Sequence, residues 1–302
     1  MNNITQLHTL VCWASRVTHS RNSLTRPICK ANVHCMNKYF TGKLGQYEQI
    51  QTEDGSQSMI NPYFSEGLHS IAGAKTETLF QYWEGCQMEA QFLSRSSISL
   101  LEVGFGMGTG LLATLEQRQK LQAHVGSPLK LNYLSFELDD LLVEHSLNNY
   151  FKNIFEKVEL ITTEQYSYYS LRAPNFEGTI LLGNGREVLP SFLKQTSHPP
   201  FTAIYQDAFS PRRNPSLWTT QWFDTLREFS SSDVILSTYS SSFSIRKSML
   251  LSGFSVMSAK GYGRKKFSTR AYLTGESDPE ILSLLENDKL EALYDCQLNG
   301  KI

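Results

Sequence analysis

The sequence is short of several features that mark whole classes of protein. No apolar run in its 302 residues approaches the about 18 residues of a membrane-spanning helix, so we expect no membrane segment. None of its five cysteines belongs to a CxxC pair and their number is odd, which argues against a disulfide framework or a zinc site and favours a reducing compartment. The formal net charge of -1 gives no overall attraction to nucleic acid, so such binding requires a local basic patch.

Acidic residues are missing from the start of the chain. The first 47 positions contain no Asp or Glu, and their basic residues are Arg16, Arg21, Arg26, Lys30, Lys38 and Lys43. This composition is typical of an organellar transit peptide, although a disordered tail, or an upstream start codon with Met36 as the natural start, explains it as well. In each case we exclude residues 1–47 from the fold. The expected location is the cytoplasm, or a mitochondrion or plastid if residues 1–35 are a transit peptide.

Beyond these absences, short apolar runs alternate with segments of helical length. The runs that we predict to be strands are SISLLEV (ending at Val103), 131–138, 178–183, 201–207 and 233–240. Alternation of this kind indicates an α/β fold with a doubly wound parallel sheet. Two further runs, 254–260 and 270–275, are expected to close the sheet as an antiparallel pair.

The rest of the chain adds smaller parts to this sheet. Residues 48–95 are expected to form an N-terminal segment, with a small sheet followed by a helix near 72–93. The main domain is assigned to 96–276. Residues 277–302 are expected to carry a C-terminal amphipathic helix, at 278–294.

A glycine-rich loop follows the first predicted strand. In LLEVGFGMGTGLL, Glu102 precedes Gly104, Gly106 and Gly108, which stand between that strand and the next helix. Glycine is needed where the backbone turns tightly and lies close to a ligand, and ligands of such sheets bind at the carboxyl ends of the strands. The GxGxG spacing, unlike the dinucleotide pattern GxGxxG, favours a nucleoside with an amino-acid tail over a pyrophosphate. A loop of this kind alone is also compatible with a simple turn.

Polar residues end the next two strands. Glu137 stands where an acid can accept both ribose hydroxyls, and Asn184 stands where an amide can hydrogen-bond an adenine edge. The plainer alternatives are a helix N-terminal charge, which Asp139 or Asp140 could supply, and an ordinary turn asparagine. Together, loop, acid and amide occur in the order of a class I S-adenosylmethionine-dependent methyltransferase, a Rossmann-like fold. We therefore predict S-adenosyl-L-methionine as the cofactor, held by Glu102, Gly104, Gly106, Gly108, Glu137 and Asn184, and no metal.

The fourth predicted strand ends in an acid, Asp207. In this architecture that position faces the reactive methyl group, and an acid there can orient an acceptor amine and receive its proton. Phe209 and Pro211 would form an apolar wall that excludes water. The alternatives are an aspartate that caps the helix predicted from Pro215 and an aspartate in a surface turn.

Four stretches resemble a known family. They are TEDGSQSMINPYFSEGLHSIAGAKTET, LEVGFGMGTGLL, DAFSPRRNPSLWT and STYSSSFSIRKSMLLSGFSVMSAKGYGRKK. In this order they resemble the methyltransferase domain of the bacterial tRNA enzyme that makes 5-methylaminomethyl-2-thiouridine, particularly its stand-alone members without the oxidase domain. The resemblance covers residues 48–275. Two positions depart from it, because Asn184 stands where aspartate is frequent and Gly110 stands where asparagine is common.

The resemblance implies N-methylation of a 5-aminomethyl group on the wobble uridine of tRNA. Basic residues expected to hold phosphates near the anticodon are Arg212, Arg213, Arg246, Lys247, Arg264, Lys265, Lys266 and Arg270. Tyr63, Phe64 and His69 match a family segment that could cover the cofactor or stack on the base. Tyr239 could line the substrate pocket. The plainer alternatives are solvated surface charges, a structural histidine and a core tyrosine.

Three other functions compete with this interpretation. A small-molecule amine methyl- or aminopropyltransferase would want several acids in its pocket, where DAFSPRRNP offers arginines. A non-catalytic tRNA-binding protein would not need the acid-GxGxG loop or Asp207. A dehydrogenase is disfavoured by the glycine spacing. No stable protein partner is implied, although a separate oxidoreductase could act on the same tRNA.

Overall fold

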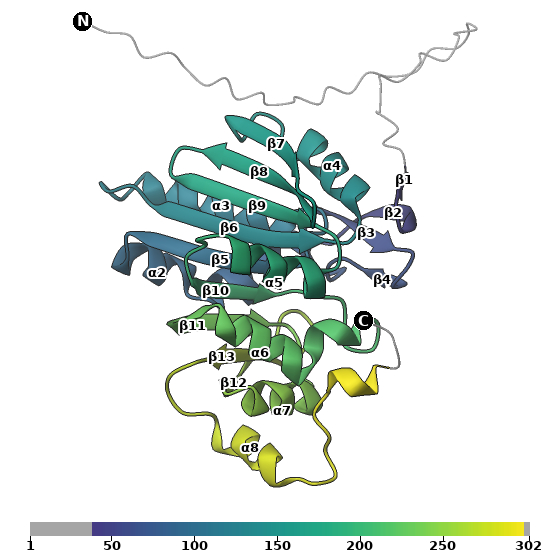
Figure 1. The fold of residues 1–302 in the computed structure, drawn as a ribbon, viewed down its shortest axis with the longest axis vertical. Coiled ribbons are helices and arrows are strands. Elements are labelled where there is room, and N and C mark those ends of the chain that lie inside the picture. The colour runs from purple at the N-terminus through teal and green to yellow at the C-terminus, as the bar shows by residue number, and fades with distance from the viewer. Residues whose placement is uncertain (1–37, 299–302) are drawn as a thin grey trace, which may run out of the picture. The chain divides into compact units, whose positions relative to one another are not determined.

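A computed structural model describes residues 38–298, in which two β-sheets are formed. The larger sheet has nine strands in the order β12-β13-β11-β10-β5-β6-β9-β8-β7 (Figure 1). Its central strands are parallel: β5 (Ser97–Val103), β6 (Lys130–Glu137), β9 (Phe176–Leu182), β10 (Phe201–Gln206) and β11 (Ser230–Thr238). The chain runs from β5 to β6 and β9 on one side and then returns to β10 on the other side. This reversal opens a crevice at the carboxyl ends of β5 and β10, where ligands of such sheets bind.

Both edges of the large sheet are antiparallel. The predicted closing pair is confirmed as β12 (Ser255–Lys260) and β13 (Phe267–Tyr272), with β13 lying between β12 and β11. The other edge was missed from the sequence. There β7 (Lys157–Thr162) and β8 (Ser167–Ala173) form a hairpin that extends the sheet beyond β9. Their side chains are only partly buried, so the apolar runs that marked the central strands are absent.

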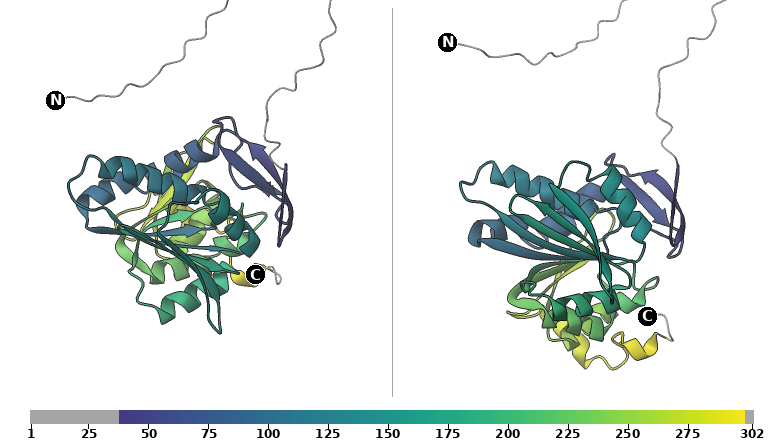
Figure 2. Two further views of the ribbon diagram at one scale, coloured as in Figure 1. Left: turned by 90° about the horizontal axis from the view of Figure 1, so that it is seen from above. Right: turned by 45° about the horizontal axis from the view of Figure 1, so that its top comes forward.

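Helices cover both faces of this sheet (Figures 1 and 2). One face packs against α5 (Gly185–Gln195), α6 (Thr220–Glu228) and α7 (Phe243–Leu251). The other packs against α2 (Met88–Ser94), α3 (Thr109–Gln122) and α4 (Asp140–Asn149). Along β5, Leu101 and Val103 face the first set, whereas Ile98 and Leu100 face the second. Because both faces are covered, the central strands carry buried apolar residues on both sides, which is why they were predictable.

The smaller sheet stands beside the large one (Figure 2). Its antiparallel strands are β1 (Tyr39–Gly42), β2 (Gly45–Gln51), β3 (Gln57–Asn61) and β4 (Glu66–Gly67). The first strand of the described residues begins at Tyr39, so the exclusion of residues 1–47 was wrong for the last part of that segment. The transit-peptide prediction and the start at Met36 lie outside the described residues. The helix predicted near 72–93 is present as three pieces, α1 (Ala74–Thr78), the π-helical turn η1 (Leu79–Glu84) and α2.

Asp139 fastens the small sheet to the large one. Its carboxylate accepts hydrogen bonds from the backbone N–H groups of Lys43 (2.9 Å) and Leu44 (3.0 Å), in the turn between β1 and β2. It also accepts one from the Tyr47 hydroxyl at 2.8 Å, and it caps α4 through the N–H of Leu142. Asp139 is fully buried. One carboxylate thus fixes both the start of α4 and the first hairpin.

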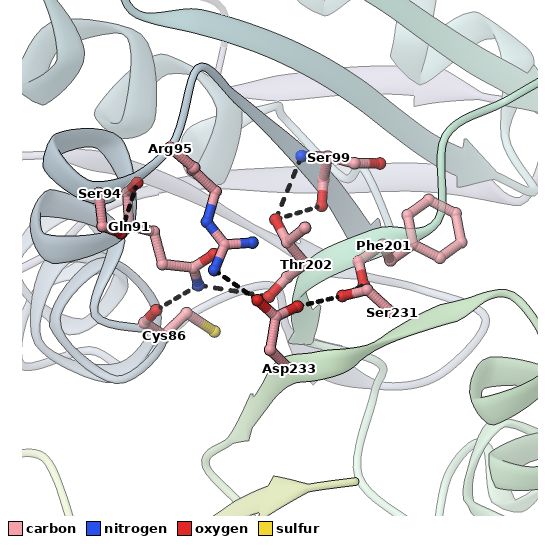
Figure 3. Close-up of polar contacts among 9 residues, drawn as sticks. All are labelled: Cys86, Gln91, Ser94, Arg95, Ser99, Phe201, Thr202, Ser231 and Asp233. Atoms are coloured by element: carbon pink, nitrogen blue, oxygen red, sulfur yellow. Dashed lines mark hydrogen bonds and ion pairs between the residues drawn. The ribbon is translucent and has the colours of Figure 1, made fainter. Parts of the chain in front are cut away.

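A polar cluster joins three strands at the edge opposite the crevice (Figure 3). Arg95, just ahead of β5, pairs with Asp233 of β11 at 2.8 Å, and Ser231 donates to the same carboxylate at 2.6 Å. The Thr202 hydroxyl of β10 donates to the carbonyl oxygen of Ser99 of β5 at 3.3 Å. These contacts hold the amino ends of β5, β10 and β11 together, away from the carboxyl ends that carry the candidate site.

The C-terminal segment differs from its prediction. In place of an amphipathic helix at 278–294 there are α8 (Pro279–Leu282), η3 (Ser283–Glu286) and η4 (Asp295–Gln297). The stretch between η3 and η4 is not helical and is held by neighbouring helices, because the backbone of Leu293 bonds to Thr220 and Ser248 at 2.8 Å each. The predicted helix at 215–228 is split into η2 (Pro215–Trp218) and α6. Nowhere between residues 38 and 298 is there a helix long and apolar enough to cross a membrane.

Candidate active site

A cavity of about 800 Å³ lies at the carboxyl edge of the central strands. Its walls come from the loops after β5, β6, β9 and β10, from the N-terminal segment 63–70, and from the turn between β12 and β13. This volume lies within the range of pockets that enclose a nucleotide-sized ligand. The cavity therefore occupies the position expected for a ligand of a doubly wound sheet.

Most of the predicted site residues line this cavity. They are Tyr63, Phe64, His69, Glu102, Gly104, Gly106, Glu137, Asn184, Asp207, Phe209, Arg212, Arg213, Tyr239 and Lys265. The predicted residues that are not among the lining residues are Gly108, Pro211, Arg246, Lys247, Arg264, Lys266 and Arg270. The structure thus brings together residues from seven separate parts of the chain, while their individual roles stay predictions.

The glycine loop leaves the space that a bound nucleoside would need. Gly104 and Gly106 have φ angles of 90° and 53°, which side chains other than glycine rarely adopt. Both line the cavity, and a Cβ atom on Gly106 would lie 3.8 Å from the Leu68 side chain, on the cavity wall. A side chain at either position would therefore project into the space that the ligand would fill. The loop fits the predicted cofactor.

Gly108 has a different role from the other two glycines. It precedes α3 with a φ of 76°, and a Cβ atom there would lie 2.6 Å from the rings of Phe105 and Phe151. The requirement for glycine thus comes from close contact between the loop and the core. Its predicted contact with the cofactor has no support from its place in the fold.

Glu102 is a buried carboxyl group under the loop. Its side chain is 3% exposed, and the Tyr133 hydroxyl donates a hydrogen bond to it. A Cβ atom on Gly110 would lie 1.8 Å from the Glu102 carboxylate, so this chain needs glycine at that position. Burial raises the pKa of Glu102 to about 8. The group is therefore largely protonated at neutral pH.

Glu137 is held at the cavity wall by backbone groups. Its carboxylate accepts hydrogen bonds from the N–H groups of Gly106 (2.9 Å), Leu138 (2.8 Å) and Asp139 (3.1 Å). These contacts link the end of β6 to the glycine loop after β5. The alternative role of a helix N-terminal charge is already filled, since Asp139 caps α4. Glu137 remains available at the place predicted for ribose recognition.

The side chain of Asn184 caps the helix that follows it. It is the N-cap of α5, where its Oδ1 accepts from the N–H of Arg186 at 3.1 Å and its Nδ2 donates to Glu187 at 3.1 Å. The plainer alternative, a turn or capping asparagine, thus accounts for its side-chain hydrogen bonds. The residue also lines the cavity, and its contact with adenine stays a prediction.

Asp207 stands directly after β10 and accepts a hydrogen bond from a tyrosine, Tyr82. The hydroxyl of Tyr82, in η1, donates a hydrogen bond to Oδ1 of Asp207. Burial raises the pKa of Asp207 well above its usual range, and the neighbouring Glu77 and Glu102 raise it further. Tyr82 was missed from the sequence because FQYWEG reads as an ordinary buried helix face.

Two more carboxyl groups in the cavity were also missed. Glu66 accepts a hydrogen bond from the Ser210 hydroxyl at 2.8 Å, and Glu77 accepts one from the N–H of Ser70 at 2.8 Å. Both line the cavity. The sequence argument against a small-molecule amine rested on the scarcity of acids in DAFSPRRNP. The N-terminal segment supplies the acids that this motif lacks.

Aromatic side chains form one wall of the cavity. The rings of Phe64 and Phe209 are stacked with centroids 4.4 Å apart, and Tyr63 meets Phe64 edge-on at 4.9 Å. The backbone at Phe209 is held by Trp218, whose Nε1 donates to its carbonyl oxygen at 2.8 Å. Tyr63 is 66% exposed, so the edge of this wall is open to solvent. Such a surface suits stacking on a base.

His69 has the environment of a structural histidine. Its Nδ1 lies 3.0 Å from the Ser58 hydroxyl, and burial lowers its pKa to about 4. The ring is therefore neutral at physiological pH, and it lines the cavity without carrying charge.

The predicted basic surface divides into buried and exposed groups. Arg246 is 4% exposed and donates to Thr269 Oγ1 at 3.0 Å and to the Ser268 carbonyl at 2.9 Å. Arg270 is 9% exposed and bonds to the same two residues. The phosphate-binding prediction was wrong for these two arginines, which hold α7 and β13 in place. Lys247 donates to a carbonyl near η3, and the exposed cations are Arg212, Arg213, Arg264, Lys265 and Lys266.

The turn between β12 and β13 closes the cavity on one side. The Lys265 ammonium lies 4.0 Å from the centroid of the Tyr239 ring, a cation–π distance. Tyr239 in turn donates to the carbonyl oxygen of Ala208 at 2.8 Å. Tyr262 bonds to the Thr76 hydroxyl, so the turn touches the N-terminal segment. In the part of the chain that is described, no group of three or more His, Cys, Asp or Glu side chains could hold a metal ion.

The sequence of this chain is similar to a methyltransferase family profile and to curated proteins. A family profile described as S-adenosyl-L-methionine-dependent methyltransferase matches residues 145–274. The tRNA 5-methylaminomethyl-2-thiouridine biosynthesis bifunctional protein MnmC of Thiobacillus denitrificans is 26% identical over 226 residues, which are 72% of this chain and 35% of that protein. Its namesake from Aeromonas salmonicida is 28% identical over 223 residues, or 68% of this chain and 32% of that one. The chain spans about a third of the length of these curated relatives.

A solved structure supports the same grouping. The crystal structure of MNMC2 from Aquifex aeolicus matches this fold with a TM-score of 0.66 and 26% sequence identity, over 84% of this chain and 80% of that one. The predicted class I methyltransferase fold is confirmed. The resemblance found in the four sequence motifs is confirmed as well.

Proposed function

We propose that this chain, an S-adenosylmethionine-dependent methyltransferase by fold and sequence similarity, methylates the amine of a 5-aminomethyl uridine at the wobble position of tRNA. The observation that carries the proposal is the position of Asp207. It is a carboxyl group at the end of β10, on the wall of a cavity that also contains the glycine loop and Glu137. An acid in that place can both orient an amine and remove its proton.

The cofactor would lie over the glycine loop. When bound, S-adenosylmethionine supplies a methyl group already activated by a sulfonium charge. Gly104 and Gly106 would leave room for its close approach, and Glu137, on the same cavity wall, would accept the ribose hydroxyls. Neutral Glu102 lies beneath the loop, where it adds no net charge close to the ligand.

The acceptor would enter from the open side of the cavity. Phe64 and Phe209 form an apolar surface on which a uridine ring can stack. Exposed Arg212, Arg213 and Lys265 lie at the same opening and would hold the phosphates of the anticodon arm. Alignment of amine and methyl group would then supply most of the rate acceleration, since the donor is intrinsically reactive.

The relatives bear on the source of the substrate. The proteins named MnmC are described as bifunctional, and this chain spans about a third of their length. We infer that an oxidoreductase activity acts on the same tRNA and supplies the aminomethyl uridine. The reaction would take place where that tRNA is found, in the cytoplasm or in an organelle that makes its own tRNA.

Methyl transfer to tRNA tests this function directly. Labelled S-adenosylmethionine would be incubated with tRNA from cells that lack the modification, followed by nucleoside analysis. Wild type should yield labelled 5-methylaminomethyl uridine, and Asp207→Ala should not. Asp233→Ala is the matched control, because this carboxylate lies in the polar cluster at the opposite edge of the sheet. If the cofactor binds but tRNA is not labelled, tRNA is refuted as the substrate. If the cofactor does not bind, the assignment of methyltransferase activity is refuted.

The acids Glu66 and Glu77 favour a second candidate, a small-molecule amine as acceptor. A polyamine carries several positive charges, and these carboxylates could bind them. The same assay decides between the candidates if spermidine and tRNA are offered separately. Transfer to spermidine alone would favour the small-molecule reaction.

A further inference from the structure

Tyr82 contacts the acid to which we assign proton transfer. Its side chain is 2% exposed, and its hydroxyl donates to Oδ1 of Asp207. Among residues 38–298, this is the one hydrogen bond that the Asp207 carboxylate accepts. Oδ2 of Asp207 therefore keeps its lone pairs for another donor.

The surroundings of Tyr82 fix its position. Its ring is stacked on Tyr205 of β10, with centroids 5.3 Å apart. The preceding residue, Gln81, donates from Nε2 to the Ser237 hydroxyl of β11 at 3.2 Å. Both residues belong to the π-helical turn η1, in which Gln81, Tyr82 and Trp83 are all buried. Single π-helical turns are uncommon and frequently occur at functional sites.

We propose that Tyr82 is a positioning residue, which holds Oδ1 of Asp207 so that Oδ2 receives the proton of the acceptor amine. The proposal rests on the proposed function for the nature of the acceptor, a primary amine. Tyr82 lies outside all four motifs that identified the family. The first of these motifs ends at Thr78, directly before η1.

The proton transfer can be written in full. A primary amine is largely an ammonium ion near neutral pH. One N–H bond of this ion breaks, its proton forms an O–H bond to Oδ2 of Asp207, and its electron pair stays on nitrogen. That pair then forms the new bond to the methyl carbon, while the electrons of the broken carbon–sulfur bond remain on sulfur. The product is a methylated ammonium ion, and Asp207 releases its proton to water.

Tyr82 matters because the other surroundings of Asp207 favour the protonated acid. Burial raises the pKa of Asp207, and so does Glu77 of α1, while Glu102 of β5 adds to this effect only when it is ionised. The hydrogen bond from Tyr82 lowers it, and the Lys265 charge lowers it as well. Tyr239, after β11, is a further titratable neighbour. A protonated Asp207 cannot accept a proton at Oδ2, so the hydroxyl of Tyr82 keeps the base available.

Titration of Asp207 in the free protein is the first test. Aspartate labelled with ¹³C at Cγ would be followed by NMR without cofactor or tRNA, and Asp207→Asn would assign the resonance. Tyr82→Phe should raise the pKa of Asp207 by about one unit, since a hydrogen bond to a charged group is lost. An unchanged pKa would overturn the proposal. This result does not depend on whether tRNA is the substrate.

The pH dependence of kcat/KM is the second test. In Tyr82→Phe the acidic limb should move to higher pH by the same amount, so activity on that limb should fall about tenfold. S-adenosylmethionine affinity should be unchanged. Tyr205→Phe is the matched control, because it removes a buried hydroxyl whose partner is Thr114, at 3.2 Å, from the ring stacked on Tyr82. The acidic limb of the pH profile of Tyr205→Phe should not move.

Each remaining outcome also decides the question. A similar loss of rate in both variants with unmoved limbs would make Tyr82 a packing residue and refute its role. If wild type transfers no methyl group to tRNA, the proposed function fails while the NMR titration still tests Tyr82. If Tyr82→Phe does not fold, fluorotyrosine at position 82 provides a second variant. Its more acidic hydroxyl should lower the pKa of Asp207, and a rise would contradict the proposal.

Discussion

The Tyr47 hydroxyl lies 2.8 Å from Oδ2 of Asp139, so a residue of the first hairpin shares a buried carboxylate with the start of α4. The same carboxylate accepts the backbone N–H groups of Lys43 and Leu44. Because Glu137 stands two residues before Asp139, the small sheet is fastened next to the predicted ribose-binding acid. The stability of the N-terminal segment and the geometry of the site are therefore linked.

Asp139→Ala should lower the free energy of unfolding by about 2 to 4 kcal/mol. The substitution removes a helix cap and leaves buried donors without an acceptor. Urea denaturation measures the loss. The control is Asp140→Ala, whose partly exposed carboxylate lies 3.7 Å from the Lys43 ammonium and should cost less than about 1 kcal/mol. Equal effects of the two substitutions would contradict the assigned role of Asp139.

Gly106→Ala should abolish or strongly weaken S-adenosylmethionine binding. The alanine would have to adopt a φ of 53° and would place a methyl group in the cavity. Calorimetric titration with the cofactor measures the effect. Gly55→Ala is the control, because Gly55 has a φ of 82° with nothing within 4 Å of its Cβ position and lies outside the cavity. It carries similar backbone strain and should bind normally, so a matching loss there would exclude a specific effect.

Glu102→Gln should change how stability depends on pH. Burial raises the pKa of Glu102 to about 8 in the folded protein, from an ordinary 4.5. Between these values the folded protein keeps a proton that the unfolded chain has lost, so wild-type stability falls as pH rises, by up to about 1.4 kcal/mol per unit. Glutamine does not titrate, and this part of the slope should vanish. Urea denaturation between about pH 5 and pH 8 provides the measurement. Exposed Glu89→Gln should leave the slope as in wild type.

Arg213→Ala should weaken tRNA binding and reduce its dependence on salt. The arginine is exposed at the cavity opening, so its loss should lower the slope of log affinity against log salt by about 1. Filter binding over a series of salt concentrations measures this slope. Lys157→Ala is the control, since Lys157 pairs with Glu159 on β7 at the far edge of the sheet. An unchanged slope in Arg213→Ala would remove this residue from the tRNA surface.

The central sheet was predictable because burial on both faces leaves a simple signal. Strands such as β5 and β10 are apolar along most of their length. The β7–β8 hairpin lies at an edge with partly exposed side chains, and no comparable run marks it. The C-terminal segment was misjudged for a different reason. Its apolar residues contact α6 and α7 from an extended chain, and spacing along the sequence does not reveal such tertiary contacts.

The site was predictable where its functional residues lie at the carboxyl ends of predicted strands. The glycine loop and Asp207 follow strands and Glu137 ends one, so their meeting at one edge follows from the topology. Tyr82, Glu66 and Glu77 come from outside the sheet, and only the folded chain brings them to Asp207. Arg246 and Arg270 illustrate the opposite error. Charge alone suggested a surface role, although both side chains satisfy buried backbone and hydroxyl groups.

The bond between Tyr262 and Thr76 joins positions separated by 186 residues. On the ribosome the glycine loop emerges long before Tyr262 does, because synthesis proceeds from the N-terminus. The glycine loop can therefore form early in synthesis. The opening of the cavity is completed only after the β12–β13 hairpin has been synthesised. A chain whose translation stops before β12 would lack the turn that closes one side of the cavity. It could not present Lys265 to an incoming RNA.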